Sequence, residues 1–298
     1  KIHLPVVGLV DHDHLPRLPD AGLEVDFREY DPSIDLVTEV LSGRSQFATT
    51  DSALIVERLK GRPVKIIANY FKRSPLVILA KPEIRQPGDL RGRRLMAAPK
   101  DIESPNFQAM FRQFGLRTED LVVVPHRFGA NDFLTGKVDA IAAFLTNEPF
   151  SLRQARKSFN VLDPANYGFE FQETNLFTTE TYARQHAETV RAFRDASNRG
   201  WRYALDHVDE MVDLIKLKYN SQNKSRAALH YEADQIMRMM LPKVYPIGSV
   251  DRDKLRRIAE FFVQLGQVAS LERLNGFIFD ATAADGSPSA LATLKVSV

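Results

Sequence analysis

The first half of the chain alternates short apolar runs with longer amphipathic stretches. Apolar runs of about four to eight residues predict strands, and amphipathic stretches of about ten or more predict helices. Strands are expected over 4–10, 23–30, 46–50, 64–71, 75–80, 93–98, 121–125, 138–145 and 159–162. Helices are expected over 33–42, 53–60 and 104–114, from 128 onwards, and after 147. This alternation predicts an α/β fold with parallel sheets and right-handed crossovers.

After about residue 175 the apolar positions recur almost entirely at helical spacing. Trp201, the only tryptophan, lies on one such stripe and is expected to pack in a core. The small, polar tail from Ala281 is expected to be loosely held. If the helical segment packs on the first unit, the chain crosses twice between two lobes, which would form a hinge with a central cleft. Lobe one would comprise 1–82 and 176–298, and lobe two 83–175.

Composition excludes several classes of protein. The 298 residues carry a net charge of +2, and no run of lysine and arginine is dense enough to predict a nucleic-acid-binding stripe. The absence of cysteine excludes disulfides, thiolate nucleophiles and cysteine-based metal sites. No window of about 18 residues is continuously apolar, so no membrane-spanning helix is predicted. At 44% hydrophobic and 26% charged residues, the composition is that of a globular protein.

The stretch 133–150 gives the clearest indication of a ligand site. Within it, 138–145 is predicted as a buried strand, and Thr146 and Asn147 could cap a helix with Pro149 in its first turn. A strand that runs directly into a helix places the helix N-terminus at the carboxyl edge of a sheet. Small ligands bind at that edge in open α/β sheets.

In lobe one, polar residues follow the first strands. Asp11 and His12 open a run of two aspartates and two histidines. Such a run could bind a metal, but it is more typical of a polar turn at a strand end. The ligands of a good metal site point towards one position in space, and residues that are merely adjacent in sequence do not ensure this. Thr49, Thr50, Asp51 and Ser52 are expected to form a strand-to-helix turn. Its N–H groups and hydroxyls suit a carboxylate, phosphate or sulfonate, and they equally suit helix capping.

Three further candidates follow the predicted strand 64–71. Phe71 could stack on a heteroaromatic ring, although core packing is at least as common for such a residue. Lys72 and Ser74 add a charge and a hydroxyl at the same strand end. We therefore expect this strand end to contribute to a ligand site.

The candidates in lobe two lie where its helices begin. They are Glu103 and Ser104, Phe128 and Asn131, and Asn147 and Glu148. The amide and the carboxylate of the last pair could bind the donors of a pyrimidine. The local alternatives are helix capping by Asn147 and complementing of the helix dipole by Glu148. Tyr167 and Asn175 lie near the second predicted crossing, where they would contact ligand or hinge.

Several stretches together resemble one family of binding proteins. They are AGLEVDF at 21–27, the stretch 40–80, DLRGRRLM at 89–96, GKVDAIAAFLTNEPF at 136–150, NYGFEFQETNLFTT at 166–179 and VRAFRDASNRGWRYALDH at 190–207. These resemble the SsuA/THI5-like (NMT1/THI5-like) periplasmic binding domains, in the order expected for that family. The last three look most like the version that serves as the extracytoplasmic sensor region of membrane-bound signalling proteins. LNGFIFD at 274–280 is also similar to what precedes the membrane segment there.

The resemblance implies a type II periplasmic-binding-protein fold of two α/β lobes. Between the lobes it implies a small ligand, and family ligands include thiamine-precursor pyrimidines and alkyl sulfonates. It implies a periplasmic or extracytoplasmic location. The implied partner is a membrane-bound output domain, of the diguanylate cyclase, phosphodiesterase or histidine kinase type, or else the permease of an ABC importer.

Neither a cofactor nor an enzymatic activity is expected. One branch of the family makes the thiamine pyrimidine with pyridoxal phosphate and a cysteine-rich motif, which a chain without cysteine does not match. The sequence also has no nucleophile elbow, phosphate loop or HExxH motif. We therefore expect binding rather than catalysis.

Two departures from the family pattern bear on the ligand. Only 11–20 separate the first strand from AGLEVDF, which is shorter than usual, so either the site differs here or residues are missing. Related sequences often have Gln-His before a Ser-Pro pair, where this chain has Lys72 and Arg73. Positive charge at this position would favour an acidic ligand.

Overall fold

The computed structural model describes residues 23–28, 34–127, 129–220, 222–280 and 292–297. The predicted strand 4–10 and the candidate residues Asp11, His12 and Phe128 lie outside these ranges. No helix of the described residues is long and apolar enough to cross a membrane.

The chain forms two compact units. The first comprises the chain up to Lys72, Gln172–Ala233 and the chain from Met240, and the second comprises Arg73–Phe171 and Asp234–Met239. Each unit has its own mixed β-sheet accompanied by helices, so the predicted α/β class is confirmed. The lobe boundaries, hinge and cleft given above stay predictions.

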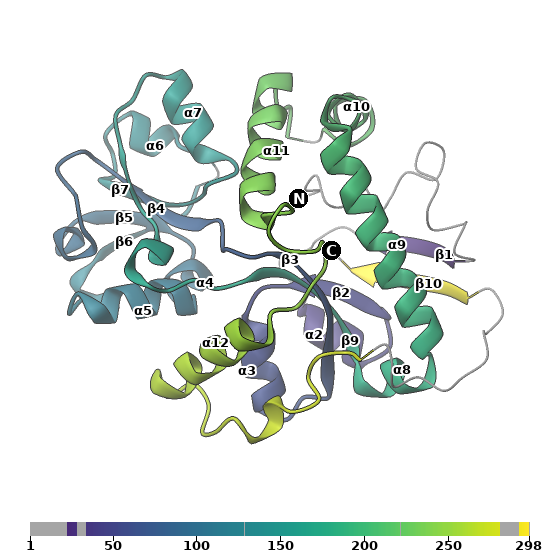
Figure 1. The fold of residues 1–298 in the computed structure, drawn as a ribbon. Helices are drawn as coiled ribbons and strands as arrows, with labels where there is room; N and C mark the ends of the chain where they lie inside the picture. Colours follow the sequence, from purple (N-terminus) through teal and green to yellow (C-terminus); the bar gives the residue numbers. More distant parts are fainter. Residues whose placement is uncertain (1–22, 29–33, 128, 221, 281–291, 298) are drawn as a thin grey trace. The chain divides into compact units, whose positions relative to one another are not determined.

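The first unit contains a five-stranded sheet (Figure 1). Its strands, in spatial order, are β1 (Leu23–Arg28), β10 (Ala292–Ser297), β2 (Phe47–Thr50), β9 (Glu173–Thr179) and β3 (Val64–Phe71). The first three are mutually parallel, whereas β9 runs antiparallel to both β2 and β3. The carboxyl ends of β2 and β3 therefore share one edge of the sheet with the start of β9.

Helices from several parts of the chain accompany this sheet. They are α2 (Leu36–Leu41), α3 (Ala53–Leu59), α8 (Glu180–Gln185), α9 (Ala187–Asp206), α10 (Val208–Leu214) and α12 (Arg252–Gln264), and α11 (Arg226–Met240) also begins in this unit. The Asp35 carboxylate accepts from the Val37 N–H at 3.0 Å and caps α2. Trp201 is buried on α9, as its stripe predicted.

The second unit contains another five-stranded sheet. Its strands, in spatial order, are β6 (Val122–Pro125), β5 (Arg94–Ala97), β7 (Ala140–Phe144), β4 (Leu76–Ala80) and β8 (Asn160–Leu162). The helices of this unit are α4 (Pro99–Ile102), α5 (Pro105–Gln113), α6 (Asn131–Leu134) and α7 (Glu148–Gln154). Alternate residues of β4 face two separate cores, Ile78 in one and Leu79 in the other, because a sheet covered on both faces buries both sets of side chains.

One ion-pair network joins three strands of the second sheet. The Asp139 carboxylate, just before β7, accepts from the Arg94 guanidinium at 3.0 Å and from the Lys81 ammonium at 2.6 Å. Arg94 begins β5, and Lys81 follows β4. The guanidinium holds the pKa of this carboxyl well below its usual range.

Three sequence-based expectations were wrong. The sheets are mixed rather than parallel, because β4 and β9 each pair antiparallel with their neighbours. Parallel pairing of consecutive strands needs a crossover connection, which is usually a helix, whereas antiparallel pairing does not. The helical part begins at Glu180 rather than near 175, since β9 extends to Thr179. Part of the tail is also ordered, as the strand β10 between β1 and β2.

Candidate ligand-binding site

A row of polar side chains crosses three strands of the first sheet. Asn175 of β9 is paired on one side with Thr50 of β2 and on the other with Asn69 of β3. Thr50 ends β2, and Asn69 lies two residues before the end of β3. The row therefore follows the carboxyl edge of the sheet, where the sequence predicted ligand contacts.

Asn69 is the centre of the hydrogen bonding in this row. It is fully buried, and its Nδ2 group donates to the Asn175 Oδ1 at 3.0 Å, to the Glu173 carbonyl at 2.9 Å and to the Phe71 carbonyl at 3.2 Å. These bonds fix the orientation of the Asn175 amide, with its oxygen towards Asn69. Asn69 was not among the predicted site residues.

Three buried amide atoms in this region have no hydrogen-bond partner among the described residues. They are Nδ2 of Asn175 and both Nε2 and Oε1 of Gln172. Asn175 is 0% and Gln172 1% exposed. A buried polar group without a partner costs about 1–3 kcal/mol, so such groups are rare in native proteins and call for an explanation. Together these atoms offer two amide donors and one carbonyl acceptor.

The backbone between these two amides is strained. Thr174 has a φ of 55°, in the left-handed region that β-branched residues avoid. Such conformations cost about 1–3 kcal/mol and cluster at functional sites. Strain and unpartnered amides thus occur within four consecutive residues, Gln172 to Asn175.

The turn after β2 holds this segment in place. The Ser52 hydroxyl, which is buried, donates to the Gln172 carbonyl at 2.5 Å. The Asp51 carboxylate accepts from the Ala53 N–H at 2.7 Å at the start of α3. Local capping therefore occupies one oxygen of Asp51, whereas Thr49 and Thr50 are half-buried at the strand end.

Lys72 does not present its charge to the edge. It is 3% exposed, and its ammonium donates to the Ser249 carbonyl at 2.6 Å, to the Asn69 carbonyl at 2.9 Å and to the Asn69 Oδ1 at 3.2 Å. Burial lowers the pKa of this lysine to about 8, although Asp251 opposes the shift. Because protein oxygens already satisfy the ammonium, it gives no support to the expected preference for an acidic ligand.

Phe71 packs inside the first unit. It is buried, and its ring meets that of Trp201 edge-on at a centroid distance of 6.1 Å. Tyr70 also contacts Trp201, at 5.2 Å. These are the contacts of a core residue, and core packing was one of the two roles that the sequence left open for Phe71. Trp201 is consequently close to the end of β3 and can report changes there.

The predicted residues of the second unit make local bonds. The Ser104 hydroxyl accepts from the Phe107 N–H at 3.4 Å as the cap of α5. The Ser74 hydroxyl accepts from the Leu76 N–H at 3.2 Å. These two hydroxyls therefore have structural roles at the start of an element.

Glu148 and Asn147 bond to each other, and Glu148 also bonds to the end of β7. The Glu148 carboxylate is buried, and it accepts from the Phe144 N–H and from the Asn147 Nδ2, each at 2.9 Å. Asn147 occupies the N-cap position of α7, as predicted. Its side chain makes no capping hydrogen bond, so that part of the prediction was wrong. The side chain is held by the glutamate instead.

The remaining candidates of the second unit are more dispersed. Glu103 and Asn131 are exposed, after β5 and β6 respectively. Since β5, β6 and β7 are parallel, the segments that follow them share one edge of the second sheet. Tyr167 instead packs partly into the core, its ring edge-on to Phe114 at 5.1 Å. Their roles as ligand contacts stay predictions.

Among the described residues no group of three or more histidine, aspartate or glutamate side chains could hold a metal ion. The residues that sequence reasoning missed, Asn69 and Gln172, are amides. Asn69 interrupts an otherwise apolar strand, VKIIANYF. A lone amide in a buried strand must find a partner, and that requirement was the available signal.

Residues 18–211 match the family model described as NMT1/THI5 like. A formylaminopyrimidine-binding protein from Halalkalibacterium halodurans is 25% identical over 212 residues, which cover 68% of this chain and 64% of that protein. The riboflavin-binding protein RibY from Chloroflexus aurantiacus is 29% identical over 203 residues, covering 65% of this chain and 57% of that one. The chain thus matches less than two thirds of the length of each relative.

Solved structures show the same fold. The periplasmic aliphatic sulphonate binding protein SsuA from Escherichia coli superposes with a TM-score of 0.63 at 15% identity. The match covers 86% of this chain and 82% of that one. At this identity the likeness concerns the fold alone, and it confirms the type II periplasmic-binding-protein fold that the resemblance implied.

Proposed function

Because this chain belongs to the NMT1/THI5-like family, we propose that it binds a small, uncharged heterocycle at the carboxyl edge of the first sheet. The observation that carries the proposal is the set of unpartnered amide atoms of Gln172 and Asn175. A ligand with both carbonyl and N–H groups would supply the missing partners. The strain at Thr174 supports the same location.

A neutral ligand suits this edge better than an anion. The Asp51 carboxylate is exposed beside it, and Lys72 is engaged with protein oxygens. An anion would therefore meet the negative charge of Asp51, and the Lys72 ammonium would not be available to balance it. Two relatives are named as binding proteins for a formylaminopyrimidine and for riboflavin, which are both nitrogen heterocycles.

We further propose that the chain is an extracytoplasmic sensor module that reports ligand binding to a membrane-bound output domain. The segment 274–280 supports this role. The Ile66 N–H donates to the Phe277 carbonyl at 3.0 Å, and the Phe279 N–H donates to the Ile66 carbonyl at 2.8 Å. That segment is thus bonded to β3, the strand that ends beside the amide row. Ligand contacts at one end of β3 could act on it directly.

The alternative role is the substrate-binding protein of an ABC importer, and two relatives are themselves small-molecule-binding proteins. Sequencing the gene beyond residue 298 separates the two roles. A membrane span followed by an output domain would support the sensor. A stop codon with an adjacent permease gene would support the importer.

Trp201 fluorescence tests the ligand class. We would titrate the protein with a formylaminopyrimidine, with riboflavin and with an alkyl sulfonate. Calorimetry would serve as a second readout, because riboflavin absorbs light itself. Saturable binding of a heterocycle and none of the sulfonate is the expected result. Binding of the sulfonate alone would overturn the neutral-ligand proposal.

A further inference from the structure

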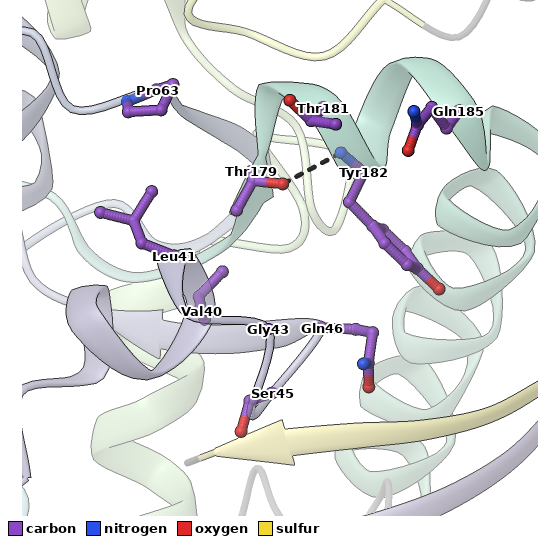
Figure 2. A pocket seen from close by; sticks show the side chains of 10 residues that line it. All are labelled: Val40, Leu41, Gly43, Ser45, Gln46, Pro63, Thr179, Thr181, Tyr182 and Gln185. Atoms are coloured by element: carbon purple, nitrogen blue, oxygen red, sulfur yellow. Dashed lines mark hydrogen bonds between the residues drawn. The ribbon is translucent and has the colours of Figure 1, made fainter.

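A cavity lies in the first unit, away from the amide row. It has a volume of about 350 Å³, within the range of small-molecule sites. Figure 2 shows its two walls: the end of α2 with the turn that leads into β2, and the junction of β9 with α8. Both walls belong to one compact unit.

The cavity and the amide row lie at opposite ends of the same strands. Gln46, on the cavity wall, precedes β2, whereas Thr50 of the row ends that strand. Thr179, also on the wall, ends β9, whereas Asn175 lies near its start. At about 3.3 Å per residue, four residues of β-strand separate the two places by roughly 13 Å. The cavity is therefore a separate place from the proposed ligand site.

Among the residues that the structure describes, no charged side chain lines the cavity. An ion that entered would lose hydration without gaining a counter-charge, which strongly disfavours charged ligands. Val40, Leu41 and Pro63 form an apolar part of the wall, and amides and hydroxyls form the rest. The lining therefore suits an uncharged molecule with one apolar face and a polar rim.

The polar side chains of the wall are partly held in place and partly available. The Gln46 Oε1 accepts from the Lys295 N–H of β10 at 2.6 Å, which fixes the amide and leaves its NH₂ group as a donor. The Gln185 amide and the Tyr182 hydroxyl make no hydrogen bond among the described residues. Burial raises the pKa of Tyr182, so its hydroxyl keeps its proton.

The Tyr182 ring is fixed by its neighbours. It meets Phe47 edge-on at 5.6 Å and lies 4.6 Å from the His186 ring. The Thr179 hydroxyl accepts from the Tyr182 N–H at 2.9 Å, as drawn in Figure 2. A rigid aromatic ring beside a fixed amide donor is a suitable surface for a flat ligand.

We propose that this cavity is a second binding site, which takes a small, flat, uncharged amide. The ligand carbonyl accepts from the Gln46 NH₂ group and the Tyr182 hydroxyl, and its N–H donates to the Gln185 carbonyl. Its ring or apolar face lies against Val40, Leu41 and Pro63. This site does not depend on the proposed function of the amide row.

Nicotinamide and uracil are suitable probes, since both are flat neutral amides. We would titrate each into ¹⁵N-labelled protein to millimolar concentration and follow the backbone and side-chain amide signals. We expect a saturable shift of the Gln46, Tyr182 and Gln185 signals, with a dissociation constant on the order of 1 mM for ligands of this size.

Gln185→Leu is expected to weaken binding by about tenfold, because it removes the acceptor for the ligand N–H. Gln113→Leu is the matched control, since it makes the same change at the last residue of α5 in the second unit, and it should leave binding unchanged. Tyr182→Leu provides a second variant, and its dispersed amide spectrum would verify folding.

Three results would overturn the proposal. One is the absence of any saturable shift with either probe. Another is a shift confined to Gln172 and Asn175, which would place the probe at the amide row. The third is unchanged affinity in both Gln185→Leu and Tyr182→Leu. Failure here leaves the amide-row proposal standing, because that proposal depends on different residues and probes.

Discussion

The two units each have an edge where polar residues follow strands, but the edges differ in how their hydrogen bonds are completed. In the second unit, Ser104 and Glu148 accept from backbone N–H groups nearby. In the first unit, Gln172 and Asn175 bury amide atoms that have no partner among the described residues. Polar residues near strand ends can thus complete local hydrogen bonds or leave buried atoms without a partner. The count of partners separates the two cases.

The largest expected effect is on ligand affinity. Asn175→Leu removes the unpartnered amide with little change in volume, and we expect it to weaken binding of a formylaminopyrimidine about tenfold to a hundredfold, because one or two ligand hydrogen bonds are lost. Removal of the buried unpartnered donor favours the folded state, whereas loss of the hydrogen bond from Asn69 Nδ2 to Asn175 Oδ1 disfavours it, so the net change in the free energy of unfolding should be small. Calorimetric titration and urea unfolding measure the two quantities.

Asn147→Leu is the matched control from the second unit. It removes an amide that bonds Glu148, so we expect a modest loss of stability and a smaller loss of affinity than for Asn175→Leu. If Asn147→Leu weakened binding more, the contrast between the two edges would be contradicted. The second unit would then contribute the stronger ligand contact.

The next largest effect is on stability in the second unit. Glu148→Ala removes the acceptor of the Phe144 N–H and should lower the free energy of unfolding by about 1–3 kcal/mol. Glu148→Gln retains one acceptor oxygen and should lose less. Urea unfolding of both variants provides the measurement. Equal stabilities of all three proteins would show that this carboxylate does not hold the turn.

A smaller, stabilising effect is expected at the strained residue. Thr174→Gly replaces a β-branched residue at φ 55° by one that adopts this conformation freely, and it should raise the free energy of unfolding by about 1 kcal/mol. Thr178→Gly, at a buried β9 position without positive φ, is the control and should destabilise the protein. A destabilised Thr174→Gly variant would mean that its contacts outweigh the strain.

The last prediction concerns the pH dependence of stability that Lys72 causes. Its folded pKa of about 8 lies below the ordinary value of 10.5, so the unfolded chain holds more protons between these values. Stability from this group therefore rises with pH from about 8 to 10.5, and the cost of burying the charge is fully present below that window. Lys72→Met should remove this contribution, measured as the difference in slope between the two proteins. Identical slopes would contradict the buried charge.

Much of the fold could be predicted because its signals are local. The apolar run 138–145 became β7, and Ser104 with Pro105 began α5 as expected. Strand direction could not be predicted, since it depends on which distant segment supplies the neighbour. β9 was missed for the same reason, because NLFTT becomes a strand only between β2 and β3.

The site was predictable only in part. The sequence located the strand end at Thr49–Asp51 and included Asn175, because polar residues after strands are visible locally. It did not find Asn69 or Gln172, and it gave Lys72 a ligand role that its contacts with Ser249 and Asn69 do not support. Whether a buried polar atom has a partner is decided by residues far away in the sequence.

The most direct test of the central claim is NMR observation of the side-chain NH₂ groups of Gln172 and Asn175 during titration with a formylaminopyrimidine. We predict that both signals shift in a saturable way and follow the same binding curve as Trp201 fluorescence. Saturable binding that leaves both amide signals unmoved would contradict the account. The ligand would then bind elsewhere, and the unpartnered amides would need a different explanation.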